Sequence, residues 1–210
     1  MISAILLGAG ESKRMGVDKL SLPFGEKTVL GRSLEALVRS KVDEVILVVH
    51  GKWDSWKGFL DGDKVKLVFN PNYRLGMSTS IRRGLRVIHP RSQGIFIALA
   101  DQPFLKSKTI DALIKAFSPG KGMIVVPSYR GERGHPVLFD RSYEKELLRL
   151  KGDKGGRSVL ERHPEKVVLV RTRSEGVVKD LDTWKDYQKA CKMRKRLKGN
   201  SMALKKRNVV

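Results

Sequence analysis

The sequence has little of what several functional classes require. It contains one cysteine, Cys191, so no disulfide can form within the chain, which fits a reducing cytoplasm. No apolar run approaches the roughly 18 residues of a membrane-spanning helix, and no basic leader precedes the first apolar segment. We therefore expect a soluble, cytoplasmic protein. The histidines are scattered without the spacing of zinc ligands, which argues against a zinc site (His50, His89, His135 and His163).

Acidic residues are scarce relative to basic ones, which gives the 210 residues a formal net charge of +21 at pH 7. Residues 189–210 carry nine of the lysines and arginines and no acidic residue, which leaves +12 on the rest. A basic body suits small polyanionic ligands, whereas a basic tail suits nucleic acid or an acidic partner protein. Because the tail lacks interleaved aromatic residues on which bases could stack, nucleic-acid binding is the less favoured interpretation.

Apolar runs alternate with amphipathic stretches through the first 126 residues. The pattern predicts strands over residues 2–7, 45–49, 65–69, 95–100 and 123–126, and helices over 29–40, 81–88 and 109–117. Continuous apolar strands separated by helices are typical of a parallel sheet that is covered on both faces. We therefore expect a three-layer, Rossmann-like α/β fold with a mostly parallel sheet.

The pattern becomes less regular after residue 126. It predicts short strands over 136–139, 166–170 and 176–181, helices over 141–150 and 158–162, and a final helix from Trp184 to about Arg196 that Asp182 and Thr183 cap. We expect one domain over residues 1–197, with a nucleotide-binding half (1–126) and a smaller, irregular acceptor-side half (127–197). Residues 198–210 are expected to be a basic, disordered tail.

The first apolar run leads directly into a glycine-rich, basic loop. Residues 8–19 contain three glycines, which leave the backbone free to approach a ligand, and three basic residues, which can neutralise phosphate. A Walker-type loop is excluded because Val17 follows Gly16 where that motif needs Lys. A dinucleotide fingerprint is excluded because its third glycine falls on Lys13. The loop therefore predicts a nucleotide-phosphate site, and a plain strand-to-helix turn is the weaker alternative.

Acidic residues follow two of the expected strands. Asp101 comes directly after the run 95–100, and the carboxyl ends of parallel strands face the ligand crevice. Because a carboxylate repels phosphate, a divalent cation between them is the natural arrangement, and Mg²⁺ prefers such mixed ligands. The alternative role for Asp101 is a helix cap. Asp180 and Asp182 share one face of the expected strand by alternation, so the sequence leaves open which one is a second metal ligand.

Three further loops are rich in glycine and polar residues. Residues 70–80 link a strand to a helix, and their hydroxyls either cap that helix or contact a nucleotide base together with Gly76. Residues 131–136 and 152–157 are basic and glycine-rich. Each alone is explained by a surface turn, but their combined polarity suggests a second, anionic substrate.

Taken in order, these motifs resemble those of nucleotidyltransferases related to the molybdenum cofactor enzymes. The pattern G-x-S-x-R-M-G-x-x-K runs from Gly10 to Lys19. The resemblance continues through Asn70-Pro71, Gly76-x-Ser78-x-Ser80, Leu99-Ala100-Asp101-Gln102-Pro103, Arg133-Gly134-His135-Pro136, Gly152-Asp153 and Asp180-Leu181-Asp182-Thr183. It spans about residues 2–190, and this ordered set is more specific than any single motif.

The resemblance implies an α/β nucleotidyltransferase that transfers CMP from CTP to the terminal phosphate of molybdopterin cofactor and releases pyrophosphate. It gives catalytic roles to Arg14, Lys19 and Asp101, and places Mg²⁺, with Mn²⁺ as the alternative, on Asp101 and Asp182. The nucleotide-binding positions that it implies are Leu7, Gly8, Ala9, Gly10, Ser12, Gly76, Ser78 and Ser80. The acceptor-binding positions are Arg133, Gly134, His135 and Asp153, and a molybdoenzyme or a cofactor-delivery protein is a further expected partner.

Two neighbouring residues point to different bases. Ala9 stands where guanylyltransferase relatives usually have glycine, which favours cytidine, whereas Gly8 stands where cytidylyltransferases usually have alanine. Guanylyl transfer to the same cofactor and transfer to a sugar or polyol phosphate therefore stay open. A nucleic-acid-binding protein and a non-catalytic cofactor carrier are the alternatives from other classes. Because a phosphate monoester acceptor is already ionised at neutral pH, nucleotidyl transfer requires no catalytic base.

Overall fold

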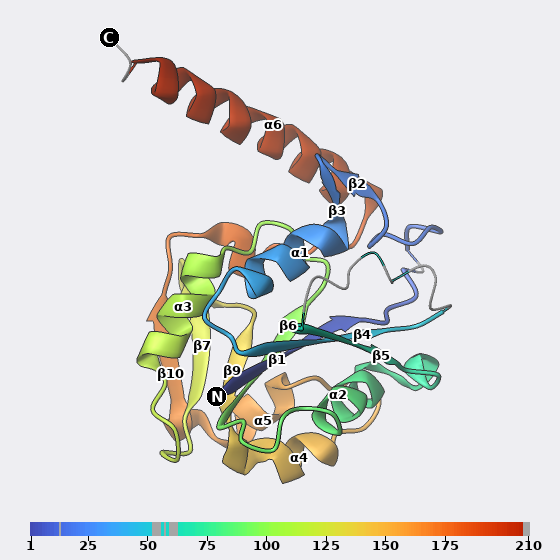
Figure 1. Cartoon of the computed structure of the whole chain (residues 1–210), viewed down its shortest axis with the longest axis vertical. Coiled ribbons are helices and arrows are strands. Elements are labelled where there is room, and N and C mark those ends of the chain that lie inside the picture. The colour runs from blue at the N-terminus through green and yellow to red at the C-terminus, as the bar shows by residue number, and fades with distance from the viewer. Residues whose placement is uncertain (13, 52–55, 57, 59–62, 208–210) are drawn as a thin grey trace.

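One large sheet organises the protein. The computed structural model describes residues 1–207 except 13, 52–55, 57 and 59–62, and its eight-stranded sheet has the order β10-β7-β9-β6-β1-β4-β5, with β8 paired to β7 (Figure 1). These strands are β1 (Ile2–Gly8), β4 (Glu44–Val49), β5 (Val65–Phe69), β6 (Gly94–Leu99), β7 (Ile124–Tyr129), β8 (Glu132–Arg133), β9 (Val137–Asp140) and β10 (Val167–Arg171). The short strands β2 (Pro23–Phe24) and β3 (Lys27–Thr28) form a separate hairpin.

Helices cover both faces of the sheet. Helices α1 (Val29–Val38) and α3 (Ser107–Ala116) lie on one face, and α2 (Met77–Leu85), α4 (Glu144–Leu148) and α5 (Arg157–Arg162) lie on the other (Figure 1). Each face has its own apolar core: Leu34 and Leu113 belong to one cluster, and Ile81 and Leu147 to the other. The expected three-layer, mostly parallel α/β fold is confirmed.

The central strands are continuous apolar runs because neighbours bury them on both sides. Strand β1 pairs in parallel with β4 and β6, and Ile5 lies opposite both Ile46 and Ile97, all three of them buried. At the carboxyl edge, the Ala100 amide donates to the Leu7 carbonyl over 3.1 Å. The loops that follow β1 and β6 therefore start side by side, and Lys19 in the first of them lies close to Asp101.

Two details of the sheet differ from the expected pattern. Strand β9 lies between β6 and β7 and runs antiparallel to both. The predicted strand over 176–181 is wrong: the structure has a 3-10 helix at Glu175–Val177 and no strand after it. Gly176 explains this packing, since a Cβ at this position would lie 2.3 Å from the Phe104 carbonyl oxygen. The segment therefore packs on the loop after β6 instead of joining the sheet.

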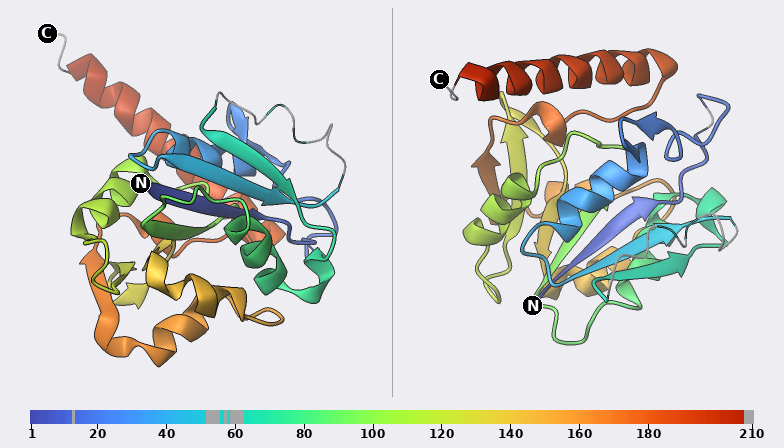
Figure 2. Two further views of the ribbon diagram at one scale, coloured as in Figure 1. Left: turned by 60° about the horizontal axis from the view of Figure 1, so that its bottom comes forward. Right: turned by 45° about the horizontal axis from the view of Figure 1, so that its top comes forward.

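The last helix is longer than the sequence predicts. Helix α6 covers Trp184–Arg207, whereas the expected helix ends near Arg196 and a disordered tail is expected from residue 198. It starts near the β2–β3 hairpin and runs beyond the sheet (Figures 1 and 2). Residues 208–210 of the expected tail lie outside the described residues. No helix in the described part of the chain is long and apolar enough to cross a membrane.

Candidate active site

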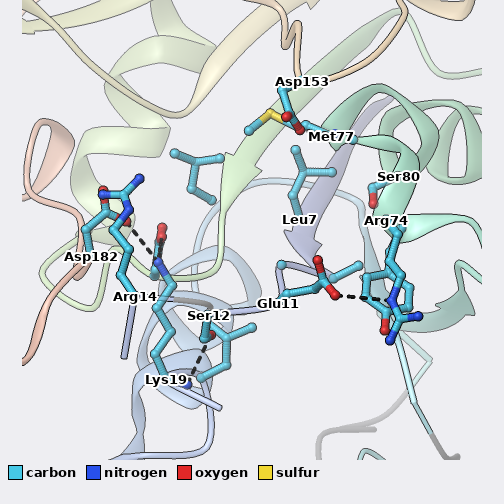
Figure 3. A pocket seen from close by; sticks show the side chains of 17 residues that line it. Leu7, Glu11, Ser12, Arg14, Lys19, Arg74, Met77, Ser80, Asp153 and Asp182 are labelled. Carbon is cyan, nitrogen blue, oxygen red and sulfur yellow. Dashed lines mark hydrogen bonds and ion pairs between the residues drawn. The ribbon is translucent and has the colours of Figure 1, made fainter. Parts of the chain in front are cut away.

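The glycine-rich loop after β1 turns sharply around Ser12. Ser12 has a φ of 51° and Gly16 a φ of 67°, so both lie in the left-handed region. The Ser12 carbonyl accepts from the Met15 amide over 2.9 Å, and the Ser12 hydroxyl accepts from the Lys19 amide over 3.2 Å. These bonds close the loop and direct the side chains of Arg14 and Lys19 toward the carboxylates at the end of β6 and before α6 (Figure 3).

Lys19 lies between two carboxylates. Its Nζ is 2.6 Å from Asp101 Oδ2 and 3.2 Å from Asp182 Oδ1, and the Lys19 and Asp101 side chains are only 13% and 18% exposed. Burial, the largest influence, lowers the pKa of Lys19, but the ion pairs with Asp101 and Asp182 together raise it above the ordinary lysine value. Lys19 therefore stays charged at neutral pH. Arg14 reaches the other oxygen of Asp182 over 2.9 Å from an exposed position.

The acidic residues around Lys19 have oxygens that suit a divalent cation. Asp101 Oδ1 is buried and has no hydrogen-bond partner among the described residues, although the other oxygen of that carboxylate binds Lys19. Among the described residues, no cluster of three His, Cys, Asp or Glu side chains could hold a metal by itself. Two carboxylates nevertheless fit Mg²⁺ or Mn²⁺, because such ions take one or two carboxylates together with substrate phosphates and water.

The structure separates the two aspartates that the sequence could not distinguish. Asp182 lines the pocket and binds Lys19 and Arg14. Asp180 accepts a hydrogen bond from Gln102 Nε2 over 3.1 Å and does not line the pocket. Burial, with a smaller contribution from Asp101 and Asp182, raises the pKa of Asp180. The expectation that Asp180 and Asp182 share one face rested on a strand over residues 176–181, which the structure does not contain.

A pocket of about 440 Å³ opens over this carboxyl edge of the sheet. It brings together most of the predicted site residues: Leu7, Ala9, Gly10, Ser12, Arg14, Lys19, Gly76, Ser80, Asp101, Asp153 and Asp182. Figure 3 shows that Arg14 and Asp182 lie at one side of the pocket, Glu11 and Arg74 at another, and Met77 with Asp153 at a third. The pocket therefore has Arg14 and Lys19 paired with carboxylates at one side, the Glu11–Arg74 ion pair at another and Asp153 at a third.

Five predicted site residues do not line this pocket. A Cβ at Gly8 would lie 3.3 Å from the Val48 carbonyl oxygen, so Gly8 faces strand β4. The Ser78 side chain is fully buried, and its hydroxyl has no hydrogen-bond partner in the described part of the chain. Arg133 is exposed on β8, Gly134 packs against the Val177 carbonyl, and the His135 amide donates to that same carbonyl.

Several residues that the sequence did not single out do line the pocket. Arg74 forms an ion pair of 3.2 Å with Glu11, and its guanidinium lies 5.6 Å from the centre of the Tyr73 ring. That ring stacks on His50 at 4.5 Å. Glu11 and Arg74 belong to the two loops already predicted to form the site, but no local pattern indicates that they pair across it. Leu20, Met77 and Leu99 complete this set.

Asp153 fills the N-terminus of helix α2. Its Oδ1 accepts from the Met77 amide over 3.2 Å, and the Ser78 amide donates to the Gly152 carbonyl over 3.0 Å. This close approach requires Gly76 to lack a side chain, because a Cβ there would lie 2.3 Å from Gly152 C. A helix N-terminus ordinarily attracts phosphate. In this protein the Asp153 carboxylate and the Gly152 carbonyl accept from the first two amides of the helix, so these two donors are not available to a phosphate.

His135 is largely enclosed, which gives a testable pH effect. Burial lowers its pKa below 6.5, although Asp101 and a backbone hydrogen bond at Ile97 act in the opposite direction. The unfolded chain therefore binds more protons at mildly acid pH, so the free energy of unfolding falls as pH drops through the ordinary histidine value. We expect His135→Asn to reduce this fall, measured by urea unfolding at mildly acid and at neutral pH. An unchanged dependence on pH would contradict this assignment.

Comparisons with known proteins point to one family with several activities. The chain is 27% identical to nicotine blue oxidoreductase of Paenarthrobacter nicotinovorans, covering 87% of this chain and 92% of that protein. It is 25% identical to molybdenum cofactor cytidylyltransferase of Escherichia coli, covering 67% and 70%. It is 38% identical to a probable molybdenum cofactor guanylyltransferase of Methanosarcina acetivorans, covering 70% and 66%.

Solved structures share the fold over nearly the whole chain. The crystal structure of a Mycobacterium tuberculosis Rv0371c homologue from Mycobacterium sp. strain JC1 has a TM-score of 0.82 at 31% identity and covers 93% of this chain and 98% of its own. Rv0371c of Mycobacterium tuberculosis in complex with manganese has a TM-score of 0.72 at 31% identity and covers 91% and 98%. Residues 4–167, more than half of the chain, match the model of the MobA-like NTP transferase domain. The chain therefore belongs to the MobA-like NTP transferase family and is a nucleotidyltransferase.

Proposed function

We propose that the protein transfers CMP from CTP to the terminal phosphate of molybdopterin cofactor and releases pyrophosphate in a Mg²⁺-dependent reaction. The observation that carries this proposal is the largely buried Lys19, held between Asp101 and Asp182 beside the glycine-rich loop. This group of charges suits a triphosphate and its metal ion. Relatives named as molybdenum cofactor cytidylyltransferase and guanylyltransferase support the choice of acceptor.

The reaction requires positioning and charge neutralisation. An acceptor phosphate oxygen attacks the α-phosphorus of CTP, the bond from that phosphorus to the β-phosphate bridge breaks, and pyrophosphate leaves with the electron pair. Arg14 and Lys19 leave Asp182 to bind the triphosphate and to neutralise charge on the departing pyrophosphate. Asp101 and Asp182 would hold Mg²⁺, which supplies further neutralisation when bound. No side chain needs to remove a proton, because the attacking phosphate is already ionised.

The distribution of charge orients both substrates. With the triphosphate at the Arg14 and Lys19 side, Asp153 and the Glu11–Arg74 ion pair border the rest of the pocket. Carboxylates repel phosphate and accept hydrogen bonds from N–H groups. We therefore assign Asp153 to the amino groups of the pterin ring. Arg133, Gly134 and His135 lie outside the pocket lining, so this assignment does not include them.

The position of Ala9 supports cytidine over guanosine. Ala9 and Gly8 point to different bases in the sequence, but only Ala9 lines the pocket, whereas Gly8 packs against β4. The residue that favours cytidine is thus the one that can contact a nucleotide. Guanylyl transfer is the second candidate, because the chain is 38% identical to a probable guanylyltransferase over 156 residues.

A comparison of four nucleotides tests this proposal. Purified protein, Mg²⁺ and molybdopterin cofactor are combined with CTP, GTP, ATP or UTP, and the release of pyrophosphate is followed. We expect turnover with CTP to exceed that with each other nucleotide by at least about 10-fold. Faster release with GTP would replace CMP by GMP in the proposal. If none of the four nucleotides releases pyrophosphate, the proposed acceptor is wrong.

A further inference from the structure

Helix α6 begins against the nucleotide-phosphate loop, although it lies beyond the residues 4–167 that match the family. The indole Nε1–H of Trp184, its first residue, donates to the Met15 carbonyl over 3.0 Å. Met15 is the neighbour of Arg14 in the loop, and its own side chain is buried. Trp184 is 43% exposed, so its ring is only partly covered, and the hydrogen bond of its N–H fixes the indole against the loop.

The contacts that hold the two cationic side chains of this loop, Arg14 and Lys19, are ion pairs that a nucleotide disrupts. Arg14 and Lys19 both bind Asp182, and a triphosphate competes for these cations. The bond from Trp184 to Met15 joins a neutral N–H to a backbone carbonyl, so phosphate does not compete with it. The loop also requires support, because the left-handed conformation of Ser12 is costly for a residue other than glycine.

We propose that Trp184 is a positioning residue of the nucleotide site. It holds the Met15 carbonyl and so keeps Arg14 and Lys19 directed at the triphosphate after their ion pairs with Asp182 have broken. This inference rests on the proposed nucleotidyl transfer, but it does not depend on which base or acceptor is used. It assigns a role in nucleotide binding to an element outside the matched family domain.

Tyr187 provides a matched control on the same helix. Its hydroxyl donates to the Pro23 carbonyl over 2.6 Å, and further along the helix the Arg194 guanidinium lies 5.5 Å from the centre of the Phe24 ring. These contacts tie α6 to the β2–β3 hairpin and not to Met15. Tyr187→Phe therefore removes one hydrogen bond to a backbone carbonyl and keeps the ring, and it leaves the contact of Trp184 with the nucleotide-phosphate loop in place. Trp184→Phe removes the hydrogen bond to that loop together with part of the indole ring.

The test compares the binding of CTP and GTP with Mg²⁺ to the full-length wild-type protein and to both variants by calorimetry, without an acceptor. We expect Trp184→Phe to weaken binding by about 3- to 10-fold, the effect of one lost hydrogen bond, and Tyr187→Phe to change it by less than about 2-fold. Hydrogen exchange supplies a second measurement. In the nucleotide complex, we expect faster exchange at amides 14–19 in Trp184→Phe only.

Each outcome separates the inference from the proposed function. Equal binding by Trp184→Phe and wild type, or equal losses in both variants, would overturn the role of Trp184 and leave the proposed function intact. A thermal midpoint lowered in Trp184→Phe with unchanged binding would indicate a purely structural residue and would also overturn it. Wild-type protein that binds neither nucleotide would refute the proposed function, and the inference would fall with it.

Discussion

Lys19→Met is expected to lower kcat/KM for pyrophosphate release by about 10²–10³-fold. Methionine preserves the length of the side chain but removes the charge that Asp101 and Asp182 hold in place. The Lys19 charge is assigned to binding the triphosphate and to neutralising the departing pyrophosphate. Its loss should therefore destabilise the transition state more than the bound substrate. The measurement is steady-state kinetics with CTP and molybdopterin cofactor.

The same substitution at another lysine is the control for this experiment. Lys27 is about half exposed and pairs with Glu35 outside the pocket, so Lys27→Met should leave turnover unchanged. Because removing Lys19 leaves Asp101 without its partner, circular dichroism must confirm that the Lys19→Met protein is folded. A folded Lys19→Met protein with near-normal turnover would contradict the assignment of the site.

Asp101→Asn is the second substitution with a large expected effect. Asparagine retains the shape of the side chain but lacks the negative charge. The buried Asp101 Oδ1, for which the described residues supply no hydrogen-bond partner, is the atom that we expect to meet a cation. We expect turnover to fall by on the order of 10³-fold, since a metal ion contributes several kcal/mol of charge stabilisation. Binding of Mn²⁺ in the presence of CTP, followed by electron paramagnetic resonance, should weaken in parallel.

Asp180→Asn separates a specific role of Asp101 from a general loss of acidic charge. Asp180 lies close enough to Asp101 and Asp182 for their charges to act on its pKa, but it accepts from Gln102 and does not line the pocket. An asparagine oxygen can accept the same hydrogen bond, so we expect Mn²⁺ binding and turnover close to wild type. If Asp180→Asn lost activity and Asp101→Asn retained it, the two roles would be reversed.

The sequence predicted the part of the site that follows strand ends. The apolar run of β1 and the glycines after it place Arg14 and Lys19 at the carboxyl edge, and the run of β6 places Asp101 there, because parallel strands present these ends together. Local pattern was enough for these residues. It also predicted the three-layer fold, since buried parallel strands read as continuous apolar runs.

The features that the sequence did not predict depend on contacts between segments that are distant in the chain. The apolar residues of segment 176–181 suggested a strand, but Gly176 packs on Phe104 and turns the segment away from the sheet. The His135 amide donates to the Val177 carbonyl, a contact between two distant segments that the local sequence does not indicate. The pairing of Glu11 with Arg74 joins residues from two loops, and no periodicity in either loop indicates it.

The most direct test of nucleotidyl transfer follows each phosphate of CTP separately. The protein is incubated with molybdopterin cofactor, Mg²⁺ and CTP that is radiolabelled either at the α- or at the γ-phosphate, and the products are separated by chromatography. Nucleotidyl transfer predicts that the α-label enters the acceptor and that the γ-label leaves in pyrophosphate. Transfer of the γ-label to the acceptor, or retention of the α-label in free CDP or CMP, would contradict it.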